Sequence, residues 1–127
     1  MKLPVVVSLF SLAALLAWAG CNGSSDPNWL EQANCTGIDA STNTYNLTVK
    51  VILDNTCALS GCHDAATQSR GINLSNYAGA RAAFETGPAL CAINHGDECL
   101  HMPKNGAKLP DVTINRLACW AKNGYKE

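Results

Sequence analysis

The chain has 127 residues, a formal net charge of −1 and 15% charged residues, which is enough length for one domain. The near-neutral charge gives no sign of a nucleic-acid partner or of a basic membrane-binding face. The sequence has no paired carboxylates, nucleophile motif or phosphate-binding loop, so we expect neither an enzyme nor a small-molecule substrate.

Residues 1–20 have the pattern of a bacterial export signal. Lys2 supplies a minimal positive charge, and residues 5–18 form an apolar run that is too short to span a bilayer comfortably. Residues 18–21, Trp-Ala-Gly-Cys, resemble a lipobox in which the cysteine is acylated, although a tryptophan replaces the usual aliphatic residue. We expect lipidation of Cys21, with ordinary secretion and a spare thiol as the alternative.

The polar segment that follows, residues 22–28, is rich in Gly, Ser and Asn and predicts a flexible tether. We therefore expect a signal peptide over residues 1–20, a lipid attachment, tether and N-terminal segment over 21–44, and a folded domain over 45–126. A chain of this kind lies in the bacterial cell envelope, held by its acyl chains to the periplasmic face or the outer membrane.

Residues 45–57 predict a helix at the start of the folded domain. Val49, Ile52 and Leu53 share one face at helical spacing, although residues 47–51 alternate in polarity like a strand. We prefer the helix because residues 57–63 contain a cysteine–histidine motif, and this motif must start at the end of a helix.

Seven cysteines are present, and an odd number in an exported protein needs an explanation. Acylation of Cys21 accounts for one of them. The other six make either three disulfides, or two disulfides with two cysteines reserved for a cofactor.

Residues 57–63, Cys-Ala-Leu-Ser-Gly-Cys-His, favour the second arrangement. A histidine directly after the second of two close cysteines resembles the Cys-x-x-Cys-His motif that attaches c-type haem. The spacing here is four residues instead of two, and Ser60-Gly61 supplies the flexibility for a bulge. The alternatives are a local disulfide between Cys57 and Cys62 with His63 as a bystander, and a zinc site formed by these three residues and a distant cysteine.

Two further helices are predicted downstream. Ser75 or Asn76 caps a helix that runs to about Glu85, stops at Gly87-Pro88 and points Tyr77, Ala80 and Phe84 inward. Asp111 begins the last helix, which Gly124 ends; its apolar face consists of Ile114, Leu117, Ala118 and Ala121.

Several segments together resemble the small bacterial class I-type cytochromes c, in particular the planctomycete-type domain and its relatives, which are often found on lipoproteins. The resemblance covers about residues 45–125 and lies mainly in the order of the segments: 45–57 before the motif, 71–77 after it, 102–109 with a Met-Pro pair, and 112–124 at the end. It implies an all-α fold in which three to four short helices and loops wrap around one covalent haem.

The resemblance also assigns the ligands. Cys57 and Cys62 form the thioether bonds, and His63 is the proximal iron ligand, with its other ring nitrogen held by an acceptor such as a backbone carbonyl. Met102 is the distal iron ligand, and His/Met ligation raises the reduction potential of the iron. The rivals to Met102 are His101, its neighbour, and then His95.

The implied function is single-electron transfer, without catalysis, to a redox partner protein that docks around residues 58–60. Two alternatives remain open. One is a five-coordinate haem sensor or weak peroxidase from which Met102 dissociates. The other is a haem-free lipoprotein stapled by disulfides, with a binding or structural role.

Four cysteines remain for disulfides, and they allow three pairings. We expect Cys91 to pair with Cys99, inside the loop before Met102, and Cys35 to pair with Cys119. We place Cys119 off the apolar stripe of the last helix, where it clamps the N-terminal segment across that helix.

Overall fold

The computed structural model describes residues 28–127, so the signal peptide, the lipidation of Cys21 and most of the tether lie outside the described residues. Residues 28–127 are helical and contain no β-strand, as the all-α prediction requires. None of the helices in this range is long and apolar enough to cross a membrane. The elements are α1 (Trp29–Gln32), the π-helical turn η1 (Tyr45–Val49), α2 (Lys50–Thr56), the 3-10 turn η2 (Ser69–Gly71), α3 (Tyr77–Glu85), α4 (Ala89–Asn94) and α5 (Asp111–Lys122).

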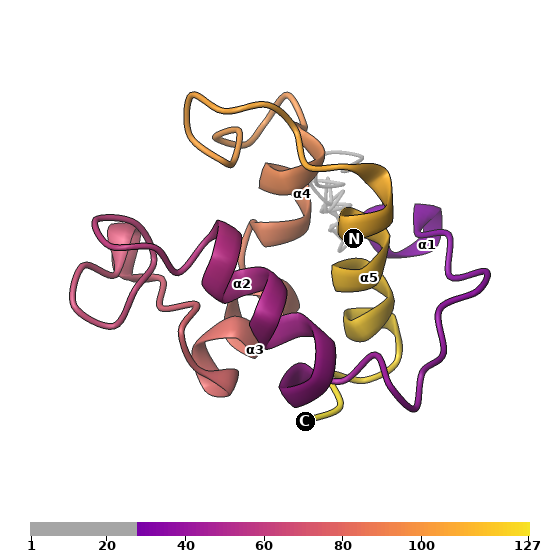
Figure 1. The fold of residues 1–127 in the computed structure, drawn as a ribbon. Helices are drawn as coiled ribbons and strands as arrows, with labels where there is room; N and C mark the ends of the chain where they lie inside the picture. Colours follow the sequence, from indigo (N-terminus) through magenta and orange to yellow (C-terminus); the bar gives the residue numbers. More distant parts are fainter. Residues whose placement is uncertain (1–27) are drawn as a thin grey trace, which may run out of the picture.

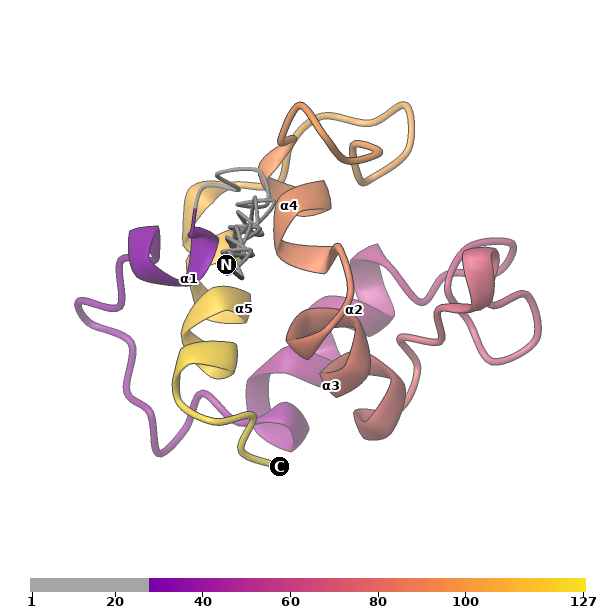
Figure 2. The same cartoon turned by 180° about the vertical axis from the view of Figure 1, so that it is seen from behind.

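Helix α5 is the centre of the fold, because it contacts α1, η1, α3 and α4 (Figure 1). Two long loops project from the helices. Residues 57–76 form one, which lies on the opposite side of the molecule to α1 in both views, and residues 95–110 form the other, which lies above α4 (Figures 1 and 2).

The apolar face predicted for the last helix is confirmed. Ile114, Leu117, Ala118 and Ala121 are all buried. Cys119 and Trp120 are fully buried as well. Cys119 is covered by its bond to Cys35 of the N-terminal segment, the clamp that the sequence predicted. The burial extends around α5 because other elements pack on several of its faces.

Trp120 is the hub of an aromatic cluster in this core. Its ring lies between 5.1 and 6.4 Å, centroid to centroid, from the rings of four other aromatic residues, mostly in edge-on arrangements. Its indole N–H donates to the carbonyl of Lys126 at 2.8 Å. The four neighbours are Tyr45, Tyr77, Phe84 and Tyr125.

The helix predicted over residues 45–57 is present as η1 followed by α2. Val49 and Leu53 are fully buried, whereas Leu47 is 65% and Val51 is 56% exposed. This burial follows helical spacing and not the alternation of a strand. The C-terminal segment fixes the start of η1, because the amide of Tyr45 donates to the carbonyl of Lys126 at 2.8 Å.

Helix α3 begins where its cap was predicted, since the side-chain oxygen of Asn76 accepts from the amide of Gly79 at 2.8 Å. The helix ends at Glu85, before Gly87-Pro88. Ala80 and Phe84 are buried and Tyr77 is partly buried.

The sequence did not predict α1 or α4, so residues 28–127 contain five α-helical segments where three to four were expected. Helix α4 begins immediately after Pro88 and buries Leu90 and Ile93 against the core. The sequence had suggested that Cys91 lies in the loop before Met102. The structure places it in helix α4 instead. Helix α1 packs on α4 and α5.

Candidate functional site

The structure leaves Cys57 and Cys62 as free thiols. Cys35 is bonded to Cys119, with the Cα atoms 5.8 Å apart, and Cys91 is bonded to Cys99, with the Cα atoms 5.9 Å apart. These are the two pairs expected from the sequence. The local disulfide between Cys57 and Cys62 is not formed, and each distant cysteine that a zinc site would need from residues 28–127 is held in a disulfide.

The two free cysteines flank a tight turn at the end of α2. Cys57 is the residue after the helix, and its amide donates to the carbonyl of Leu53 at 2.8 Å. The amide of His63 then donates to the carbonyl of Cys57 at 3.2 Å, which closes the turn. Gly61 has φ of +81°, a conformation that favours glycine, so this residue accommodates the two additional residues of the motif.

The two thiols have different surroundings. Cys62 is exposed, whereas Cys57 is partly buried and its sulfur lies 3.2 Å from the hydroxyl of Thr56. Burial raises the pKa of the Cys57 thiol, because a low-dielectric environment disfavours the thiolate, and the contact with Thr56 offsets only part of this effect.

His63 is 9% exposed, and its Nδ1 lies 3.2 Å from the carbonyl oxygen of Ile72. A carbonyl oxygen only accepts hydrogen bonds, so Nδ1 is the donor. In the neutral ring this leaves Nε2 with a free lone pair, which is the form that binds a metal ion.

Main-chain hydrogen bonds hold the loop around His63. The carbonyl of Cys62 accepts from Ser69 at 2.9 Å, and the carbonyl of His63 accepts from Leu74 at 2.8 Å. The residue after the second cysteine is therefore fixed on both sides, and the imidazole does not depend on its single side-chain bond for its orientation.

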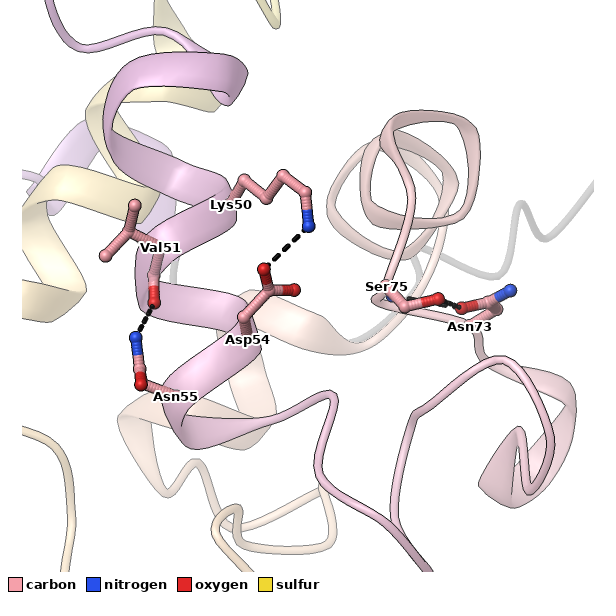
Figure 3. A network of polar contacts seen from close by, with 6 residues as sticks. All are labelled: Lys50, Val51, Asp54, Asn55, Asn73 and Ser75. Atoms are coloured by element: carbon pink, nitrogen blue, oxygen red, sulfur yellow. Dashed lines mark hydrogen bonds and ion pairs between the residues drawn. The ribbon is translucent and has the colours of Figure 1, made fainter.

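Polar contacts lie within the segments on either side of this loop (Figure 3). On α2, Lys50 and Asp54 form an ion pair of 2.6 Å. Before α3, the hydroxyl of Ser75 donates to the side-chain oxygen of Asn73 at 2.6 Å. A Cβ atom at Gly79 would lie within the backbone of Asn73, so this turn packs directly on α3.

Met102 lies on the second loop and is partly buried, and its backbone forms hydrogen bonds with α4 and with its own loop. Its amide donates to the carbonyl of Ala92 at 3.0 Å, and its carbonyl lies 3.1 Å from Nε2 of His95. The exposed His101 stacks flat on His95, with centroids 4.5 Å apart and planes 7° apart. The contact of His95 with Met102 was missed by sequence reasoning, because it depends on a left-handed turn at His95, with φ of 58°.

The structure thus gathers Cys57, Cys62 and His63 in one loop and puts Met102 on a separate loop, residues 95–110. Two free thiols and an imidazole with an available Nε2 are the donor set that a covalent c-type haem uses, so the residues present fit that group in their chemistry. Within residues 28–127, no three or more His, Cys, Asp or Glu side chains are gathered so that they alone could hold a metal ion.

A separate cavity of about 220 Å³ lies between α1, α4 and α5. Trp29, Asn94, Asn115 and Ile114 are among its lining residues, and none of the predicted ligands is.

Comparison of the chain with protein-family models, curated proteins and solved structures found no match.

Proposed function

We propose that this chain is a mono-haem c-type cytochrome that transfers single electrons at a membrane surface. The observation that supports this most strongly is the pair of free thiols beside the buried His63, in a chain whose other described cysteines are all in disulfides. The carbonyl of Ile72 adds support, because it holds the imidazole in the tautomer that an iron ligand requires.

Each residue of the site has a defined role in this proposal. Cys57 and Cys62 would hold the porphyrin through thioether bonds, His63 would bind the iron through its free ring nitrogen, and Met102 would supply the other iron ligand. The haem, when bound, supplies a one-electron iron couple. The thioether sulfur of Met102 would raise the potential of that couple and would block access of oxygen and peroxide to the iron, so the chain would act as a carrier and not as an enzyme.

The proposed partner is a redox protein that docks beside the attachment turn. Leu59, at the centre of this turn, is 45% exposed and offers an apolar contact next to the two cysteines. A lipid on Cys21 would hold the carrier at the periplasmic face or the outer membrane, where it would meet membrane-bound donors or acceptors.

The decisive experiment is to produce the full chain in a bacterium that has the cytochrome c maturation machinery and to measure the intact mass. We expect a red protein whose mass exceeds that of the mature, lipid-modified polypeptide by one haem, and a haem stain that persists after denaturation. The double variant Cys57→Ser/Cys62→Ser should lose the covalent haem. Ser60→Ala, in the same turn, is the matched control and should keep it. A colourless wild-type chain whose mass includes no haem would refute the proposal and favour the haem-free lipoprotein.

The distal ligand is tested separately. Methionine-to-iron bonding gives ferric cytochromes a weak charge-transfer band in the far red, and we expect this band in the wild type and not in Met102→Ala. Persistence of the band in Met102→Ala would remove Met102 as the ligand. Its absence from the wild type, together with ready binding of carbon monoxide by the ferrous form, would favour the five-coordinate sensor or peroxidase.

A further inference from the structure

The loop that carries Met102 is closed by contacts that meet at the end of α4. The carbonyl of Ala92 accepts from the amide of His95 at 3.2 Å and from the amide of Met102 at 3.0 Å, so the start of the loop and Met102 are held at one oxygen. The disulfide between Cys91 and Cys99 joins the helix to the same loop.

The side chain of His95 adds a second restraint at Met102. Because a carbonyl oxygen only accepts, Nε2 of His95 donates to the carbonyl of Met102. The N–H and the C=O of Met102 are thereby both fixed, one by the backbone of α4 and the other by an imidazole. This pair of contacts sets the direction in which the Met102 side chain leaves the backbone.

The imidazole of His95 also contacts His101, the alternative distal ligand. The ring of His101 lies flat on the ring of His95, at 4.5 Å between centroids. His101 adjoins Met102 in the sequence, so a small rotation of the chain would exchange one side chain for the other. A stacked ring is held in place by its partner and is less free to make that exchange.

We propose that His95 is a positioning residue that selects Met102, and not His101, as the distal ligand of the iron. The inference rests on the proposed function, since it requires a bound haem. His95 does not touch the iron in this scheme; it acts through the Met102 carbonyl and through the ring of His101.

The test uses the full chain with covalent haem and three variants. His95→Asn removes both the hydrogen bond and the stacking, and asparagine tolerates the positive φ at this position. His101→Ala removes the rival alone, and His95→Asn/His101→Ala removes both rings. The far-red methionine band and the reduction potential are measured for each at one pH.

We expect His95→Asn to lose most of the band and to shift to a lower potential, because His101 replaces Met102. His101→Ala should keep the band, and the double variant should regain it, since no rival is left. The inference is overturned if His95→Asn keeps the band in full. It is also overturned if the double variant fails to regain the band, which would make His95 only a structural support of the loop.

The two proposals fail in different ways. A colourless chain refutes the haem itself. A red wild-type chain with covalent haem but without the methionine band refutes the role of His95 while leaving the covalent haem in place. A red chain whose band is insensitive to His95→Asn does the same.

Discussion

At the scale of single residues, the candidate site depends on the state of three side chains. His63 is buried and donates from Nδ1, so its other ring nitrogen is ready to bind a metal ion. Cys57 is partly buried beside Thr56, whereas Cys62 is exposed. The two thiols should therefore react at different rates before any cofactor is attached.

We expect an alkylating reagent such as iodoacetamide to modify Cys62 before Cys57 in the haem-free chain. The thiolate is the reactive form, and burial raises the pKa of Cys57, so less of this residue is ionised at neutral pH. Its labelling should accelerate as the pH is raised toward that pKa. Peptide mass spectrometry over a time course measures both rates, and Cys62→Ser is the control that isolates Cys57. Faster labelling of Cys57 than of Cys62 at neutral pH would contradict this prediction.

Of the site, the sequence predicted the residue types and their spacing but not the environment. The flexible Ser60-Gly61 pair and a carbonyl partner for His63 were predicted from chemistry, and the structure supplies Gly61 with a positive φ and the carbonyl of Ile72. That Ile72 in particular is the partner depends on how the loop folds back, which has no local sequence signal. The burial of Cys57 depends on tertiary packing for the same reason.

At the scale of elements, α5 joins the rest of the fold. Its buried residues contact several neighbouring elements, while its first turn is open to solvent: Leu117 is 0% exposed and Val112 is 61% exposed. Replacing each of these two residues by alanine therefore tests whether the buried side chains of α5 stabilise the fold.

We expect Leu117→Ala to lower the free energy of unfolding by about 2–5 kcal/mol, because it removes buried methyl groups and leaves a cavity. Val112→Ala is the matched control in the same helix and should change it by less than about 0.5 kcal/mol. Urea unfolding of the two variants measures the difference. Equal decreases in the free energy of unfolding for the two variants would mean that α5 does not pack as the structure shows.

Long periodic segments were predictable, and short ones were not. The last helix has twelve residues with a regular apolar face, and α3 has a clear cap at Asn76. Helix α4 has only six residues and follows Gly87-Pro88, which indicates a stop and not a new start. Helix α1 has four residues and is held by packing on α4 and α5, an interaction that local propensity does not reveal.

At the scale of the whole molecule, two disulfides constrain very different lengths of chain. Cys35 and Cys119 are 84 residues apart and join the segment after α1 to α5. Cys91 and Cys99 are 8 residues apart and join α4 to the loop before Met102. An amide of the N-terminal segment reinforces the long bridge, since Asn34 donates to the side chain of Asn115 at 3.1 Å.

We expect removal of the long bridge to cost more stability than removal of the short one. Loop-closure entropy gives about 4–5 kcal/mol for the first and about 2–3 kcal/mol for the second. Denaturant unfolding of Cys35→Ser/Cys119→Ser and Cys91→Ser/Cys99→Ser compares them directly, with each chain carrying one intact bridge. A larger cost for the short bridge would indicate that local packing, and not the constraint on the unfolded chain, dominates.

The bridge between Cys35 and Cys119 has a practical consequence for handling the protein. A protease that cuts the backbone at any point between these residues releases no fragment, because the sulfur–sulfur bond still links the two pieces. The projecting loop of residues 57–76, with many exposed residues, is a natural place for such a cut. A nicked sample would then migrate as one band on a non-reducing gel, and only a reducing agent would separate the pieces.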